Sequence, residues 1–337
     1  MPRLTLSFIS AFNERVDPLM NGTVKPEGID IVPTYSHPSE TFWRQLKFQE
    51  FDIAEMSMSS YLIARARGFD MIALPVFPSR RLFHTELSYH TDSGIKEPGD
   101  LIGKRLGVGE YQQTAALWTR GILEHEFGVS QFKVHWYMER TEELSHGGAT
   151  GFTPPPGISF QRIPPEKSMA SMLVDHELDV AAISSPWKNM PNVIGRSHRI
   201  KGSDGDWSKV KPLFPDRMSE GARLFQKFGF LPVNHAYIIR GDIYNKYPWV
   251  AFNLYSGFLK AKQYFNEKLL ERIPSALFFG PEYLATTRQM FGDDPYPYGV
   301  KANRKMLATL IDYSHEQGLT SKKLKIEELF APATLDL

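Results

Sequence analysis

Short apolar runs alternate along the chain with stretches in which apolar residues recur every three to four positions. The short runs are closed by Pro, Gly or polar residues, which is typical of buried strands. This pattern predicts strands at 4–9, 29–34, 51–55, 71–77, 106–108, 134–137 and 178–183. It predicts helices at 39–46, 61–66, 115–127 and 168–176, and a mostly helical segment from residue 248 onward. Strands that alternate with helices indicate parallel sheets covered by helices on both faces.

The length of the chain favours two lobes. It has 337 residues, and a single hydrophobic core stops growing at roughly 250–300 residues. The strand–helix pattern also occurs in two successive units, so we expect an α/β protein with two lobes. In open α/β sheets a ligand binds outside the carboxyl ends of the strands. The loops in which to search for a site are therefore 10–15, 55–60, 78–84, 109–114 and 184–187.

Composition excludes several classes of function. Lys and Arg total 39 against 38 Asp and Glu, which gives no long-range attraction for nucleic acid or anionic lipid, so we expect neither as a partner. The absence of cysteine excludes disulfides, thiolate-ligated zinc, iron–sulfur clusters and a cysteine nucleophile. The apolar residues 4–12 lack a small-residue cleavage pattern, so a first strand is a better interpretation than a signal peptide. No run approaches the roughly 20 apolar residues that span a bilayer. We expect a cytoplasmic protein.

Three segments are similar to parts of a known fold. Residues 52–61, 100–108 and 178–183 resemble segments of type II periplasmic-binding-protein folds. The resemblance implies a two-lobed α/β fold, each lobe a mainly parallel sheet flanked by helices, with the ligand cleft between the lobes. It implies that residues 1–95 and 236–337 form one lobe, and that residues 96–235, with the return hinge, form the other.

A second resemblance is more specific. Residues 107–123, 79–84 and 232–240 resemble the 4,5-dihydroxyphthalate decarboxylase family, and the similarity covers most of residues 1–265. It implies a cleft that binds a small aromatic carboxylate.

The turn from Glu110 to Thr114 is an expected carboxylate site. It lies between a strand and a helix, where unpaired N–H groups and the helix dipole favour an anion. Tyr111, Gln112 and Thr114 would line this site. The alternative is that Thr114 only caps the helix.

Two arginines follow a predicted strand. A guanidinium group can bind a carboxylate through two parallel hydrogen bonds, and Arg80 and Arg81 fall on an expected cleft loop. We expect one of them to hold a substrate carboxylate. The alternative is a solvated surface pair.

His84 and His235 are the expected proton donors. Histidine titrates near neutral pH, and the family resemblance favours these two, although a lone histidine is more often structural. Glu55 or Glu110 would act as a base if burial raises its pKa. We predict no cofactor. A divalent metal held by His84, His235 and Glu55 is the alternative.

Polar strips follow one strand in each predicted lobe. Ser57 and Ser59 form the first strip, and Ser184 and Ser185 form the second. We expect these hydroxyls to donate hydrogen bonds to ligand oxygens. The alternative is ordinary helix capping.

The resemblance implies conversion of 4,5-dihydroxyphthalate to 3,4-dihydroxybenzoate and carbon dioxide. Each ring hydroxyl of this diacid is para to one carboxylate, so a phenol can supply electrons when the ring carbon is protonated. The alternative is a solute-binding protein without chemistry, a transporter receptor or a sensor, because the same cleft would serve it. A homo-oligomer is compatible with either function.

Overall fold

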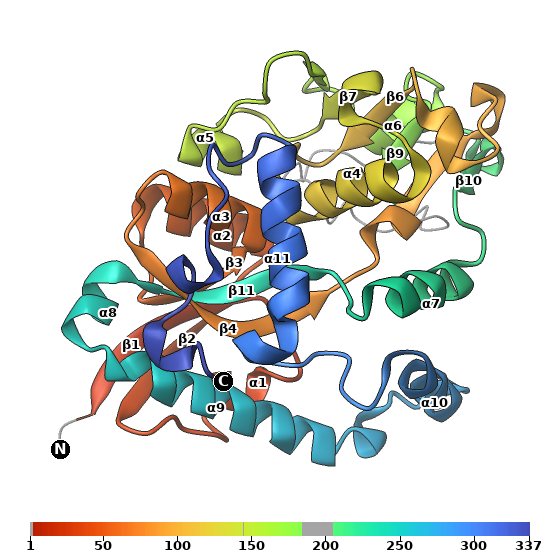
Figure 1. Cartoon of the computed structure of the whole chain (residues 1–337). Coiled ribbons are helices and arrows are strands. Elements are labelled where there is room, and N and C mark those ends of the chain that lie inside the picture. The colour runs from red at the N-terminus through yellow and green to blue at the C-terminus, as the bar shows by residue number, and fades with distance from the viewer. Residues whose placement is uncertain (1–2, 144, 184–204) are drawn as a thin grey trace.

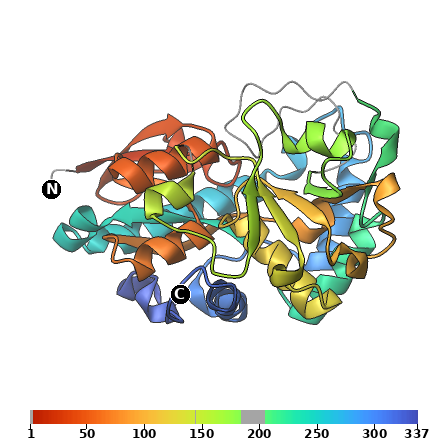
Figure 2. The ribbon, with the colours of Figure 1, turned by 90° about the horizontal axis from the view of Figure 1, so that it is seen from above.

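The computed structural model describes residues 3–143, 145–183 and 205–337. In it the chain forms two mixed β-sheets, each flanked by helices, and Figure 2 shows the two halves side by side. The predicted two-lobed α/β architecture is therefore confirmed.

The first sheet has the strand order β2-β1-β3-β11-β4. Its strands are β1 (Leu4–Ser10), β2 (Ile29–Tyr35), β3 (Ile53–Ser57), β4 (Met71–Arg80) and β11 (Val233–Arg240). β1 pairs in parallel with β2 and β3, whereas β11 runs antiparallel to both β3 and β4. This register places His235 of β11 directly opposite Ser57, the last residue of β3.

The second sheet has the strand order β10-β5-β9-β6-β7-β8. Its strands are β5 (Leu87–His90), β6 (Arg105–Val108), β7 (His135–Met138), β8 (Ser159–Arg162), β9 (Val180–Ala182) and β10 (Val210–Pro212). The strands from β9 to β8 are parallel, and β5 and β10 are antiparallel additions at one edge. β5 belongs to this sheet although it precedes residue 96, and the lobe boundaries at 95 and 235 stay a prediction.

Helices cover both sheets (Figure 1). They are α1 (Asp17–Met20), α2 (Pro38–Phe48), α3 (Met58–Ala66), α4 (Thr114–Phe127), α5 (His146–Thr150), α6 (Met169–Val174), α7 (Arg217–Phe228), α8 (Gly241–Lys246), α9 (Trp249–Glu267), α10 (Gly280–Phe291) and α11 (Val300–Glu316). α2 begins after His37, whose side chain accepts a hydrogen bond from the Ser39 N–H. α4 ends at Gly128, which has a φ of 69° and so takes the left-handed conformation that favours glycine. Within the described residues no helix is long and apolar enough to cross a membrane.

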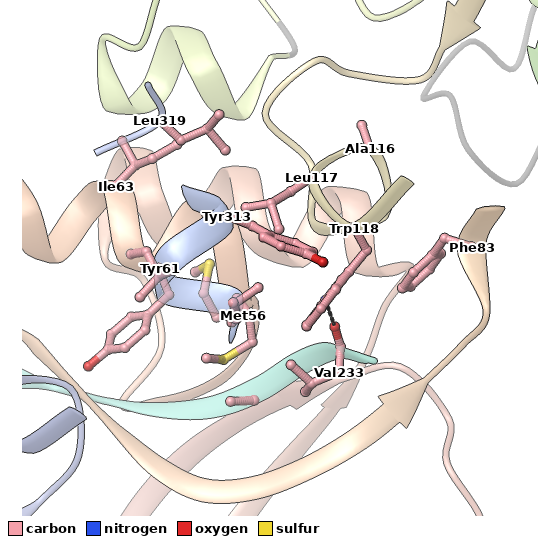
Figure 3. Packing of buried hydrophobic residues seen from close by; sticks show 14 of the residues in the cluster. Met56, Tyr61, Ile63, Phe83, Ala116, Leu117, Trp118, Val233, Tyr313 and Leu319 are labelled. Carbon is pink, nitrogen blue, oxygen red and sulfur yellow. Dashed lines mark hydrogen bonds between the residues drawn. The ribbon is translucent and has the colours of Figure 1, made fainter. Parts of the chain in front are cut away.

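One hydrophobic cluster joins the two halves of the molecule. It includes Met56 of β3, Trp118 of α4 and Tyr313 of α11, all of them buried (Figure 3). The indole N–H of Trp118 donates a hydrogen bond of 2.8 Å to the backbone oxygen of Val233 in β11. Helix α4 of the second half is thereby attached to the strand that carries His235. The carboxyl ends of β1, β3 and β6 carry the predicted site loops 10–15, 55–60 and 109–114, and hydrogen bonds there join Ser10 to Glu55 and Ser57 to Thr114.

Candidate active site between the two sheets

A buried carboxylate–imidazole pair lies where β3 and β11 meet. His235 Nδ1 is 2.6 Å from Glu55 Oε1. The other oxygen of Glu55 accepts hydrogen bonds from the Ala11 N–H at 2.9 Å and the Ser10 hydroxyl at 3.1 Å, at the carboxyl end of β1. Because a carboxylate only accepts hydrogen bonds, Nδ1 of His235 carries the shared proton. Glu55 therefore fixes both the orientation and the tautomer of the imidazole.

The same contacts keep Glu55 ionised. Burial by itself would raise the pKa of this carboxyl, but the hydrogen bond and charge of His235 lower it, as do the donors of Ala11 and Ser10. The net effect is a lowered pKa. The condition for Glu55 to act as a base, a pKa raised by burial, is therefore not met, because the group is buried together with its donors.

A buried aromatic ring packs against the imidazole of His235. The ring of Phe42 in α2 lies edge-on to the imidazole, with centroids 4.7 Å apart, and Phe42 is buried. Nε2 of His235 has no hydrogen-bond partner within the part of the chain that the structure describes. The imidazole thus keeps one nitrogen available for proton transfer.

A second buried carboxylate follows β6. Glu110 is bonded to Arg140 and accepts from the Ser145 hydroxyl at 2.6 Å and the Gly147 N–H at 2.7 Å. His146 Nδ1 is 3.6 Å away. Burial would raise the pKa of Glu110, but His146, Arg140 and these donors lower it overall. The condition of a raised pKa is not met for Glu110 either, and this carboxylate anchors Arg140.

Hydroxyl groups join the two halves beside these pairs. The hydroxyl oxygens of Ser57 and Thr114 are 2.9 Å apart, and the Ser59 N–H donates to Thr114 Oγ1 at 3.0 Å. Gln112 lies next to them, with its side-chain nitrogen 3.2 Å from Glu110 Oε1. Thr114 is the first residue of α4 and Gln113 is the cap residue, so Thr114 does not cap this helix through its side chain. The first turns of α3 and α4 therefore meet at a cluster of hydroxyls.

Helix α2 reaches across to the second half of the molecule. Arg140 Nη2 donates to the Ser39 hydroxyl at 3.0 Å, and His146 Nε2 is 3.2 Å from the Ser39 backbone oxygen. His146 also packs edge-on against Phe42, with centroids 5.5 Å apart. Figure 2 shows α5, which begins at His146, against α2.

Comparison with known proteins shows the family of this chain. No protein-family model matches it. A 4,5-dihydroxyphthalate decarboxylase of Comamonas testosteroni is 31% identical over 339 residues, which cover 100% of this chain and 99% of the relative. The chain belongs to the 4,5-dihydroxyphthalate decarboxylase family. A second 4,5-dihydroxyphthalate decarboxylase, from Pseudomonas putida, is 34% identical over 62% of this chain and 83% of its own length.

Solved structures similar to this decarboxylase-family chain share its fold. The periplasmic aliphatic sulphonate binding protein SsuA from Escherichia coli has a TM-score of 0.52 at 14% identity, over 98% of this chain and 92% of that one. The alkanesulfonate-binding protein SsuA from Xanthomonas axonopodis pv. citri also has a TM-score of 0.52 at 14% identity, over 99% and 98%. The predicted periplasmic-binding-protein-like fold is confirmed.

Four of the predicted site residues of this family member have other partners. His84 is buried and bonded through Nε2 to Glu220 of α7 at 2.9 Å. Arg80 is buried and donates to the backbone oxygens of residues 231 and 297, and burial lowers its pKa to about 10. Arg81 is half-exposed and pairs with Glu86 at 2.7 Å. The hydroxyl of Tyr111 donates to Gln131 in the core.

The alternative metal site does not assemble. Among the described residues, one group of three ligating side chains lies within 4.8 Å of one another, and it consists of His90, Asp92 and His176. It contains none of His84, His235 and Glu55. Lys209 already pairs with Asp92 at 2.8 Å in that group. Ser184 and Ser185, which were expected to donate hydrogen bonds to ligand oxygens, lie outside the described residues.

Sequence reasoning missed four residues of this decarboxylase site: Ser39, Phe42, Arg140 and His146. His146 begins the short helix α5, after Ser145 as its cap. The signal available was Ser145 as an N-cap before His146. Arg140 carried no signal, because it follows the end of β7 by two residues in an unpatterned segment.

Proposed function

We propose that this protein decarboxylates 4,5-dihydroxyphthalate to 3,4-dihydroxybenzoate. The observation that carries the proposal is the Glu55–His235 pair, a buried imidazole with a fixed tautomer and an available Nε2 at the ends of two strands. The curated relatives that bear this activity in their names supply the substrate.

His235 protonates the ring carbon that bears the departing carboxylate. The para phenol first releases its proton to water. The proton of Nε2 then moves to that carbon while the phenolate oxygen supplies the electrons, which gives a cyclohexadienone-like intermediate. The carbon–carbon bond then breaks, carbon dioxide leaves, and the bond electrons restore the aromatic ring. The phenol regains its proton from solvent, and His235 is recharged by water. The net change is one carboxylate and one proton converted to a C–H bond and carbon dioxide.

The retained carboxylate binds the hydroxyl cluster at the starts of α3 and α4. Ser57, Ser59 and Thr114 present hydroxyl groups there. The helix starts add partial positive charge, which favours an anion. This arrangement supplies the carboxylate clamp that Arg80 and Arg81 were expected to provide.

The departing carboxylate lies on the side of Phe42. This ring is 4% exposed and packs against His235, so little water reaches the space beside it. Loss of carbon dioxide discharges a carboxylate, and a poorly solvated carboxylate gains most from that loss. The phenol supplies the electrons, so the route needs no organic cofactor.

A cytoplasmic location and a homo-oligomeric state stay part of the proposal.

A turnover assay tests this function. Purified protein is mixed with 4,5-dihydroxyphthalate, with and without a chelator, and carbon dioxide and 3,4-dihydroxybenzoate are quantified. We expect equal amounts of both products and no effect of the chelator. Saturable binding without either product would show a solute-binding protein, and loss of turnover with the chelator would show a metal-dependent reaction.

A further inference from the structure

Two carboxylate–histidine units face the ring of Phe42, one from each half of the molecule. Glu55 holds His235 on one side, and Glu110 lies beside His146 on the other. The centroid of Phe42 is 4.7 Å from that of His235 and 5.5 Å from that of His146. The two imidazole centroids are therefore no more than about 10 Å apart.

The upper limit of this separation equals the length that one substrate ring and its two contacts would span. A phenol oxygen and the ring carbon para to it are about 4 Å apart, and a hydrogen-bond or proton-transfer contact adds about 3 Å at each end. A ring whose carbon faces His235 therefore places its para hydroxyl near the opposite unit.

The Glu110–His146 side of the site carries two hydrogen-bond donors, Arg140 and His146. Glu110 is ionised, because its pKa is lowered overall despite burial, and it anchors the guanidinium of Arg140. Arg140 Nη2 points to the Ser39 hydroxyl and donates to it. His146 Nε2 donates to the Ser39 backbone oxygen, since a carbonyl only accepts.

Ser39 thus presents two neutral oxygens to two donors of the other half. These bonds cross between the halves and have to break when the halves separate to admit a ligand. The two adjacent hydroxyls of the substrate ring also carry neutral oxygens, so they can accept hydrogen bonds from the same two donors in place of Ser39.

We propose that Arg140 and His146 bind the two adjacent hydroxyls of the substrate and hold the one para to the departing carboxylate as a phenolate. This inference rests on the proposed function, and it assigns the catechol end of the substrate to the second half of the protein. The phenol proton is released to water when the ring binds. A cation placed against the phenolate oxygen stabilises the electron source of the reaction.

The test compares two ligands that undergo no decarboxylation at this site: 3,4-dihydroxybenzoate and benzoate, which lacks both hydroxyls. Dissociation constants are measured by calorimetry for wild type, His146→Ala and Arg140→Lys. We expect wild type to bind 3,4-dihydroxybenzoate at least about tenfold tighter than benzoate. In both variants this ratio falls to about twofold, while the benzoate constant stays within about twofold of wild type.

A spectroscopic signature accompanies the binding. The absorption of bound 3,4-dihydroxybenzoate in wild type shifts to that of its phenolate at a pH where the free ligand keeps its phenol protons. The variants lose this shift. His125→Ala is the matched control, because His125 also pairs with a glutamate, Glu316, but at an exposed position.

Equal weakening of both ligands in the variants would overturn the inference and indicate a structural role. So would a wild-type protein with no preference between the ligands. If His146→Ala does not fold, Arg140→Lys decides, because it keeps the charge beside Glu110. A wild type that prefers 3,4-dihydroxybenzoate but releases no carbon dioxide would contradict the proposed function and leave this inference standing.

Discussion

The reactivity of His235 depends on the charge of Glu55. Glu55→Gln keeps an oxygen that accepts from Nδ1 of His235. It removes the negative charge that stabilises the protonated imidazolium, which is the form that donates the proton. We expect kcat to fall by about 100-fold or more with KM changed by less than about threefold, because the carboxylate acts on proton transfer. Steady-state kinetics measures both. Glu316→Gln, at the exposed partner of His125, is the control. Equal effects on kcat and KM would assign Glu55 to substrate binding.

Glu110 makes stability depend on pH. Its folded-state pKa lies below the ordinary 4.5, so its contribution is complete above pH 4.5 and is lost as the pH falls through the lower folded-state value. Removing one partner of a buried ion pair costs about 3–5 kcal/mol. We therefore expect Glu110→Gln to lower the free energy of unfolding at pH 7, and the difference from wild type to shrink below pH 4.5. Urea unfolding of both proteins at pH 7 and at pH 4 measures this difference in stability.

Glu327→Gln is the control for that experiment, because Glu327 forms an exposed pair with Arg304. We expect it to leave the unfolding curve nearly unchanged at both pH values. A Glu110→Gln penalty of the same size at pH 7 and at pH 4 would show that shape, rather than charge, is what Glu110 contributes.

At the residue scale the sequence identified part of the site. Glu55, His235, Ser57, Ser59 and Thr114 come together because each follows or faces the end of a buried strand, which apolar runs reveal. The roles of His84 and Arg80 were not predictable in this way. Both fall on a strand-end loop, but their partners, Glu220 and the backbone near residue 297, are more than 130 positions away in sequence. Pairing at that distance leaves no local pattern.

At the element scale the close approach of α4 to α11 positions the cleft. Gly121 of α4 packs directly against the ring of Tyr313, and a Cβ at this position would overlap that ring. We expect Gly121→Ala to lower the free energy of unfolding by about 1–3 kcal/mol, because an overpacked contact forces the helices apart. Thermal unfolding measures it. Gly99→Ala, where the added carbon meets nothing closer than 3.9 Å, should be nearly neutral. Equal Tm values for the two variants would contradict this account.

Helices and strands with a clear apolar pattern were predictable from the sequence, and strands that depend on distant partners in the sheet were not. The helix at 115–127 and the strands β1, β2, β3, β6, β7 and β9 agree with the structure to within one or two residues. β5, β8 and β10, which have only three or four residues each, were missed. The eight-residue β11 was missed as well, and it pairs with β3 and β4, which lie far before it in the chain. Short polar strands gain their stability from the sheet they join, so their own sequence carries little signal.

At the scale of the whole molecule a ligand bridges the two halves. A compound that binds Thr114 and Arg140 on one half and His235 on the other favours the folded, closed form. We expect 3,4-dihydroxybenzoate at 100 times its Kd to stabilise the protein by about 2.7 kcal/mol. A rise in Tm measures this. Thr114→Val, which removes the hydroxyl at equal volume, should reduce the rise.

Thr309→Val is the matched control, because Thr309 lies half-buried on α11 and its hydroxyl donates to the Lys305 backbone oxygen of its own helix. Its Tm rise should equal that of wild type. A ligand that raised the Tm of Thr114→Val as much as that of wild type would place the bound carboxylate away from the starts of α3 and α4.

The most direct measurement compares the decarboxylation rates of His235→Asn and His125→Asn with that of wild type on 4,5-dihydroxyphthalate. Substrate binding is measured on the same samples. The account predicts that His235→Asn loses at least about 100-fold in kcat while its affinity for the substrate changes by less than about threefold, and that His125→Asn matches wild type. A His235→Asn protein that releases carbon dioxide at the wild-type rate would contradict the account.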